Sequence, residues 1–168
     1  MLEDQLVELG RNGPFGPREV AGAMKTLSLA GLNADQVSKA TKPSLDLALT
    51  GDTTIEKAAE SLVAIGTAYG YLPEQFASVS DAITKAAAIS MSSVNSMMES
   101  FRAASVVAQQ YKVSLADTAT GLAVLANIGI RGSSAGVVGI AAEAGVATTS
   151  GVTTGSSLGF LLKKLNIG

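Results

Sequence analysis

The chain has 168 residues, a formal net charge of −2, and neither cysteine nor histidine. Without cysteine there are no disulfides or thiolate metal sites, and without histidine the commonest general base and zinc ligand are missing. The 12 basic residues are scattered along the sequence, so we expect no direct binding of nucleic acid. Only 15% of the residues are charged, against about a quarter in a typical domain. This predicts that an oligomer, an enclosing partner or a membrane covers part of the surface.

Helix-start signals recur about every twenty residues, each pairing a capping residue or first-turn proline with an apolar run. They fall at residues 16–19, 33–36, 53–56, 72–75, 92–94, 114–117 and 133–135. Glycines lie in the linkers, and glycine leaves a helix most easily through positive φ. We expect four structural turns that tolerate alanine poorly, at Gly31, Gly70, Gly129 and Gly132. The spacing predicts short antiparallel helices.

The first helix is predicted over residues 1–9, with Gly10 ending it. A second helix follows over residues 18–30, and a third begins after Asn33 and runs to about Thr41. Proline disrupts a helix interior, so Pro43 is expected to kink the chain or to start another short helix.

The second half shows the clearest helical periodicity. Helices are predicted over residues 54–69, 73–90, 94–111 and 114–128. The last of these is apolar nearly all round, which is typical of a central helix. No segment before residue 136 combines strand length with strict alternation, so the predicted fold class is all-α. The predicted core includes Leu62, Phe101, Leu122 and Leu125.

The composition changes near residue 135. Residues 135–162 hold one charge, Glu143, and are dense in Gly, Ser and Thr. We therefore divide the chain into a helical domain over residues 1–134 and an apolar tail over residues 135–168. Three G-x-x-x-G spacings in residues 132–159 are of a kind that supports close helix packing in lipid. Membrane contact through residues 135–162 is thus an alternative to a flexible or partner-covered tail.

The candidates for catalysis are weak. Glu56 and Glu60 share one helix face, but they are more typical of a solvated surface than of a hydrolase site. The glycine-rich stretch 129–136 lacks the Lys-Ser/Thr end of a phosphate-binding loop and follows a helix, not a strand. We predict no catalytic residue, no cofactor and no metal site.

Three phrases in order carry a resemblance to a known family. They are AGLNADQVSKATKPSLDLAL, TTIEKAAESLVAIGTAYGYLPEQFASVSDAITKAAAIS and SMMESFRAASVVAQQYKVSLADTATGLAVLANIGIRGSSAG. The region from about residue 9 to residue 136 resembles the core region of the tail tape measure proteins of long-tailed bacteriophages and prophages. Order, spacing and loop residues agree together, with the last phrase the most family-like.

This resemblance implies a structural, non-enzymatic role. Tape measure proteins occupy the lumen of the tail tube, help to set tail length and leave the tube ahead of the DNA. Some are proposed to help the genome cross the cell envelope. The implied partners are further copies of the chain and the tail tube, tail-tip or baseplate and tail assembly chaperone proteins. The implied locations are the virion tail and, during assembly, the host cytoplasm.

Two features depart from the family pattern. As one continuous helix, 168 residues would span about 250 Å, too short to measure a typical tail, which suggests a fragment, a split product or a degenerate prophage copy. The family usually continues after the Ser-x-Ala-Gly with an amphipathic helix, whereas here Val137-Val138-Gly139 leads into the Gly/Thr-rich tail. A helical scaffold of another assembly and a membrane-active segment released from the tail therefore stay as alternatives.

Overall fold

The computed structural model describes residues 2–136, and the predicted all-α fold is confirmed because these residues form helices and no strand. The helices are α1 (Leu2–Asn12), α2 (Pro17–Leu29), α3 (Ala34–Gly51), α4 (Ile55–Ala68), the 3₁₀ helix η1 (Pro73–Gln75), α5 (Phe76–Ala88), α6 (Val94–Tyr111) and α7 (Leu115–Asn127). A last helical turn covers residues 133–136.

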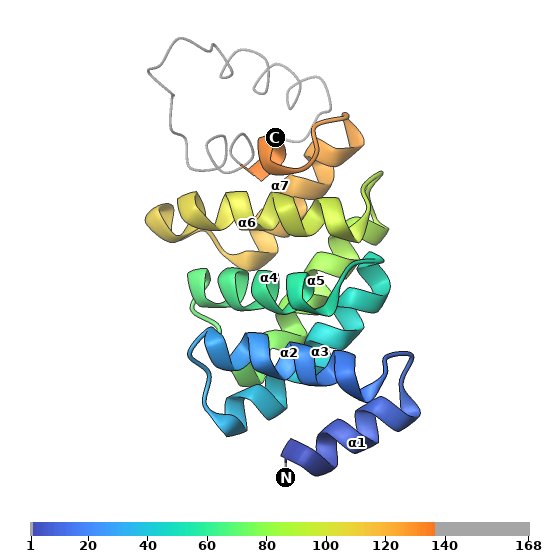
Figure 1. Cartoon of the computed structure of the whole chain (residues 1–168). Helices are drawn as coiled ribbons and strands as arrows, with labels where there is room; N and C mark the ends of the chain where they lie inside the picture. The colour runs from blue at the N-terminus through green and yellow to red at the C-terminus, as the bar shows by residue number, and fades with distance from the viewer. Residues whose placement is uncertain (1, 137–168) are drawn as a thin grey trace.

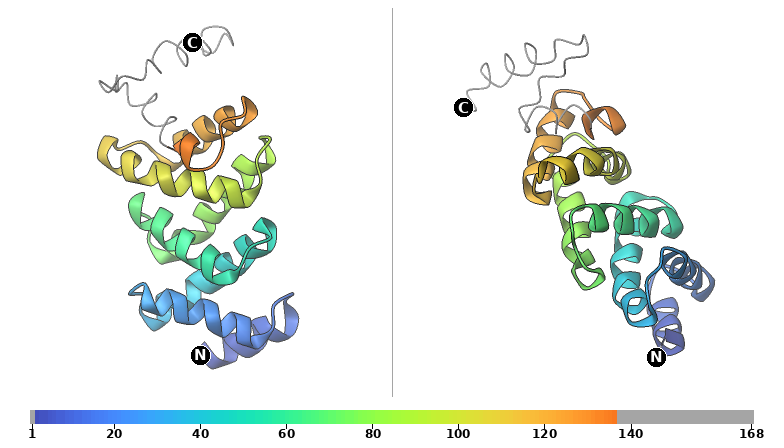
Figure 2. Two further views of the ribbon diagram at one scale, coloured as in Figure 1. Left: turned by 45° about the horizontal axis from the view of Figure 1, so that its top comes forward. Right: turned by 90° about the vertical axis from the view of Figure 1, so that its left-hand side faces the viewer.

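The helices form two layers that stack along one direction (Figures 1 and 2). One layer holds α2, α4 and α6, and the other holds α3, α5 and α7, with contacts between neighbours in each layer. Each first-layer helix is followed by the second-layer helix that returns beside it, so α2–α3, α4–α5 and α6–α7 are antiparallel pairs. Helix α1 packs against α2 and α3 at the N-terminal end of the stack.

The first-layer helices begin at regular intervals. Their capping residues are Gly16, Thr54 and Ser93, which lie 38 and 39 residues apart. The side chains of Thr54 and Ser93 accept hydrogen bonds from the backbone N–H groups three residues on. The chain therefore has a structural repeat of about 39 residues in which each unit is one helical hairpin, as in stacked solenoid proteins.

The second-layer segments begin in an equally regular way, at Asn33, Leu72 and Ser114. In the first two repeats a glutamine three residues on accepts from the backbone N–H of the capping residue, at 3.0 Å in both cases. In the third, the Ser114 hydroxyl accepts from the N–H of Asp117. Helix starts thus recur about every twenty residues because each repeat contains two of them, one for each layer.

A left-handed residue follows each first-layer helix. Gly31 and Gly70 have φ values of +93° and +74°, and Lys112 takes the same role in the third repeat with a φ of +55°. The backbone N–H of the residue after it donates to the carbonyl five residues earlier, as from Tyr71 to Gly66 at 2.8 Å, and this bond closes the helix end. Gly129 and Gly132, with φ values of +92° and +65°, lie after α7.

The core lies between the two layers and continues from repeat to repeat. Leu62 and Phe101 are fully buried, and Leu122 and Leu125 are buried in α7. The eighth residue after each first-layer capping residue is a buried large side chain, namely Met24, Leu62 or Phe101. Small residues, such as Ala23 and Ala104, fill the positions between them and let the helices approach closely.

Two predicted helix ends, at Gly10 and near Thr41, are wrong. Helix α1 does not end at Gly10 but continues to Asn12. A Cβ atom at Gly10 would lie 2.7–2.8 Å from Pro17, so this glycine allows close packing of α1 on the start of α2. Helix α3 runs through Pro43 without dividing. On either side of the proline, the Thr41 and Ser44 hydroxyls donate to backbone carbonyls four residues back.

The position of α7 also differs from the prediction of a central helix. In the described part of the chain α7 is the last long helix, and it packs against α5 and α6 only. Its residues Ala116 and Thr120 are exposed. The apolar character of α7 therefore exceeds what its described contacts require.

Candidate functional surface

The carboxylates considered for catalysis, Glu56 and Glu60, are both exposed on α4, and neither lines the two hollows described below. Among residues 2–136 no group of three or more acidic side chains is placed to hold a metal ion. In the same residues, no helix has the length and apolarity needed to cross a membrane. The surfaces of the stack are the remaining candidates for function.

One lysine joins α3 of the first repeat to η1, which begins the second-layer segment of the next repeat. Lys39 in α3 lies 2.7 Å from Asp35 and 3.2 Å from Glu74 in η1. The hydrogen bonds to Asp35 and then to Glu74 raise the pKa of Lys39. The pKa of Glu74 is lowered, first by the hydrogen bond from its own backbone N–H and then by Lys39. Because these groups are exposed, the two ion pairs contribute little to the stability of the fold.

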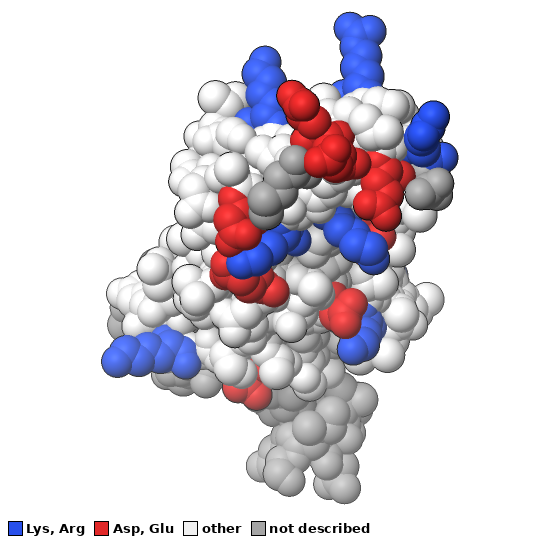
Figure 3. Space-filling view, turned by 90° about the horizontal axis from the view of Figure 1, so that it is seen from below, with Lys and Arg blue, Asp and Glu red and all other residues white. Residues whose placement is uncertain are grey.

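A second ion pair joins neighbouring repeats in the first layer, with Lys57 of α4 at 3.3 Å from Glu99 of α6. Elsewhere the charges are mixed. Figure 3, seen from the α1 end, shows basic and acidic side chains interspersed over that face. This face therefore offers no continuous basic surface of the kind that binds nucleic acid.

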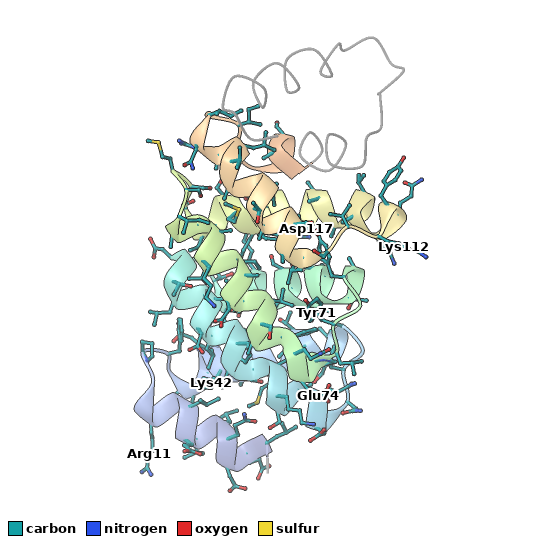
Figure 4. The ribbon with its side chains drawn as sticks, turned by 180° about the vertical axis from the view of Figure 1, so that it is seen from behind. Arg11, Lys42, Tyr71, Glu74, Lys112 and Asp117 are labelled. Atoms are coloured by element: carbon teal, nitrogen blue, oxygen red, sulfur yellow. The ribbon has the colours of Figure 1, made fainter. Side chains whose placement is uncertain are left out.

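Two of the hollows on the surface are lined entirely by described residues. A cleft of about 240 Å³ lies between α1, the α1–α2 connection and α3, and is lined by Leu9, Phe15, Leu45 and Lys42 among others. Figure 4 shows Lys42 and Arg11 toward this end of the stack. A more open groove of about 370 Å³ follows α5 and α7 and is lined by small residues, by Ile89 and by the charged Asp81 and Lys85.

Exposed apolar side chains mark both edges of the stack, where the helices are connected. Leu29, Leu72 and Tyr111, one from each repeat, are 79%, 62% and 42% exposed. Their connections lie at one edge in Figure 1, and Tyr71, Glu74 and Lys112 mark the same edge from behind in Figure 4. The opposite edge carries Leu49, Ile89, Met91 and Ile128. Such recurring apolar residues are typical of surfaces that contact other proteins.

The comparison with known proteins decides the family. The sequence model of the phage-related minor tail proteins matches residues 3–166, nearly the whole chain. The chain belongs to this family. It is 29% identical over 135 residues to the tape measure protein of Pneumococcus phage Dp-1, and 27% identical over 135 residues to the probable tape measure protein of Escherichia phage P2. These matches confirm the resemblance found in the sequence.

The matched region covers 80% of this chain in both comparisons, but only 12% of the Dp-1 protein and 17% of the P2 protein. The minor tail protein described here thus corresponds to a small part of those relatives. No solved structure matches the chain.

The stacked repeat is a feature that could not be seen in the individual helix predictions and was missed. Every second helix-start signal, counted from residue 16, marks the start of a first-layer helix, and the regular spacing of these signals would have revealed the repeat.

Proposed function

We propose that this chain is a helical core segment of a tail tape measure protein, a non-enzymatic component that takes part in tail assembly and tail-length determination. The observation that carries the proposal is the match of 135 residues to two tape measure proteins. The stacked all-α fold supports it, since that fold presents exposed apolar side chains for protein contacts.

The partners we propose are other tail proteins: the tail tube, the tail tip or baseplate, the assembly chaperones and further copies of this chain. The apolar residues at both edges of the stack, such as Leu72 and Ile89, support lateral contacts of this kind. The sparse charge supports enclosure in the tube lumen, after assembly in the host cytoplasm.

The division of the chain into a helical domain over residues 1–134 and a tail over residues 135–168 stays a prediction. Most of the segment proposed for membrane contact, residues 137–162, lies outside the described residues.

The fold constrains how this segment contributes to length. In a continuous helix, one repeat of about 39 residues would span about 58 Å, since a helix rises about 1.5 Å per residue. In the stack, one repeat adds only the distance between packed helices, about 10 Å. The two states of the same residues therefore differ about sixfold in length.

The test is to delete one repeat, residues 54–92, from the tape measure protein in assembling tails and to measure tail length by electron microscopy. This deletion joins residue 53 to Ser93 and preserves the alternation of layers. A shortening of about 10 Å is expected for a stacked segment and about 58 Å for an extended one. Unchanged length with normal tail yield would refute a role in length determination.

A shorter deletion serves as control. Removing residues 54–73 takes away α4 and leaves two second-layer helices in succession. A stacked segment should then lose stability and tail yield, whereas an extended segment should only shorten by about 30 Å.

A further inference from the structure

The C-terminal end of the described stack begins another unit. Gly132 lies 39 residues after Ser93, the interval that separates Ser93 from Thr54. The N–H groups of Ala135 and Gly136 lie 3.1 and 3.4 Å from the Gly132 carbonyl, which forms the first turn of a helix. By position, Gly132 is the fourth member of the series of first-layer starts.

Burial follows the same register. The fourth residue after each start is buried, namely Val20, Ala58, Met97 and Gly136. Ala135 is also buried, with 1% of its surface exposed, and belongs to the continuous core. The turn at residues 133–136 is therefore packed into the stack in the manner of α4 and α6.

The contact with α6 is close. A Cβ atom at Gly136 would lie 2.3 Å from the Ser100 carbonyl oxygen and 2.6 Å from both the Ala103 Cβ and the Ala104 nitrogen. The Ser100 hydroxyl also donates to the Gly132 carbonyl at 2.9 Å. Backbone meets backbone here, so only glycine fits at position 136. This crossing seats the turn directly on the face of α6 that points away from α4.

That face of α6 lacks a complete cover among the described residues. Ala103 and Val107 are only half-buried, and Gln110 is exposed one turn further along. The first-layer helices run in the same direction, since each is followed by a returning helix (Figure 1). A helix that continued the turn at residues 133–136 in this common direction would run along α6. The residues that follow Gly136 in the sequence, Val-Val-Gly-Ile-Ala-Ala, are apolar and mostly small, as a close approach requires.

We propose that Gly132 begins a fourth repeat and that the face of α6 carrying Ala103 and Val107 is the docking surface for the chain following Gly136. The occupant is residues 137 to about 147 of the same molecule. The inference does not depend on the proposed role in the tail. It identifies the described helices as part of a stack that continues by the addition of repeats.

Engineered disulfides test the docking, because the native chain has no cysteine. Val107 lies one turn after Ala103 in α6. If the turn at residues 133–136 continues as a helix, Ile140 would lie one turn after Gly136, so the proposal makes Val107 and Ile140 neighbours. A disulfide forms readily only where Cα atoms lie within about 7 Å. The Val107→Cys/Ile140→Cys variant of the full chain should form an intramolecular disulfide at least tenfold faster than the control pair Arg102→Cys/Ile140→Cys, since Arg102 is exposed on another side of α6.

Non-reducing gels separate the outcomes, and helicity of the reduced variants shows that both have folded. Equal rates in the two pairs, no bond in either, or bonds only between molecules would overturn the proposal, the last by assigning this face to a second copy. Adding Gly136→Val to the Val107/Ile140 pair should reduce its rate at least tenfold. An unchanged rate would show that the crossing at Ser100 does not direct the chain.

Discussion

Replacing Gly66 by alanine tests the packing between successive helices. The substitution favours the helical conformation locally but brings a new methyl group against the next helix, so its two effects on the free energy of unfolding have opposite signs. Gly66 lies in α4 and is buried. Replacing a glycine by alanine in a helix interior normally stabilises a protein by about 0.5–1 kcal/mol. Here a Cβ atom would lie 2.4 Å from Cε1 and 2.9 Å from Cδ1 of Phe76, the first residue of α5. Phe76 is 1% exposed and belongs to the buried core.

Overpacking of this kind costs about 1–3 kcal/mol. After the gain in helix propensity is subtracted, we expect Gly66→Ala to lower the free energy of unfolding by about 1 kcal/mol. Gly22 in α2 is the matched control. A Cβ atom there meets only the Glu56 carboxylate at 2.7 Å, and this exposed side chain can rotate away. Gly22→Ala should therefore raise the free energy of unfolding by about 0.5–1 kcal/mol.

Urea denaturation followed by circular dichroism at 222 nm measures both variants. A second comparison, with Gly66→Ala combined with Phe76→Leu, should show a favourable coupling energy, because the smaller side chain makes room for the new methyl group. If Gly66→Ala stabilised the protein as much as Gly22→Ala, the close packing of α4 on Phe76 would not exist as described.

Three further predictions concern turns, core and charge. Gly70→Ala should cost about 1–2 kcal/mol because of its positive φ, whereas Lys112→Gly should stabilise by up to about 1 kcal/mol; urea denaturation checks both signs. Phe101→Ala should cost about 3–5 kcal/mol in the same assay. The pKa of Glu74 lies below its ordinary value of 4.5, so its contribution is present above that value and lost as the pH falls through the folded-state pKa. In Lys39→Gln, an NMR titration should show a higher Glu74 pKa, and no rise would mean that the ion pair is absent in solution.

The helix positions were predictable because their signals are local. The Ser93 and Ser114 hydroxyls accept from backbone N–H groups at the helix starts, and these bonds depend only on residues three positions apart. Consequently, the predicted helices near residues 94–111 and 114–128 agree closely with α6 and α7. Gly10 misled the prediction because its close approach to Pro17 in the next helix cannot be inferred from the sequence of α1 alone. Pro43 misled it because α3 continues through the proline.

The repeat was harder to predict from the sequence for a related reason. Equivalent positions keep their burial but not their residue type, as with Met24, Leu62 and Phe101 or with Gly70 and Lys112. A stack constrains volume and backbone conformation at each position, and several residue types satisfy both. The structure added no support for a catalytic role of the carboxylates considered in the sequence. The edge surfaces could not be predicted, because they form only when the connections of separate hairpins come together.

The stacked form also bears on the contribution to tail length that we propose for this segment. Extending a repeat into a continuous helix would expose the large side chains between its layers, and burying one such side chain is worth about 1.5–3 kcal/mol. Met24, Leu62 and Phe101 provide one of these in each repeat, with further apolar residues beside them. Extension therefore requires that the tube wall or other copies of the protein bury the same surface. Without such a cover the stack is the more stable state, and one repeat contributes about 10 Å to length. A shortening near 58 Å after the repeat deletion would accordingly mean that the tail interior replaces the contacts between the two helical layers.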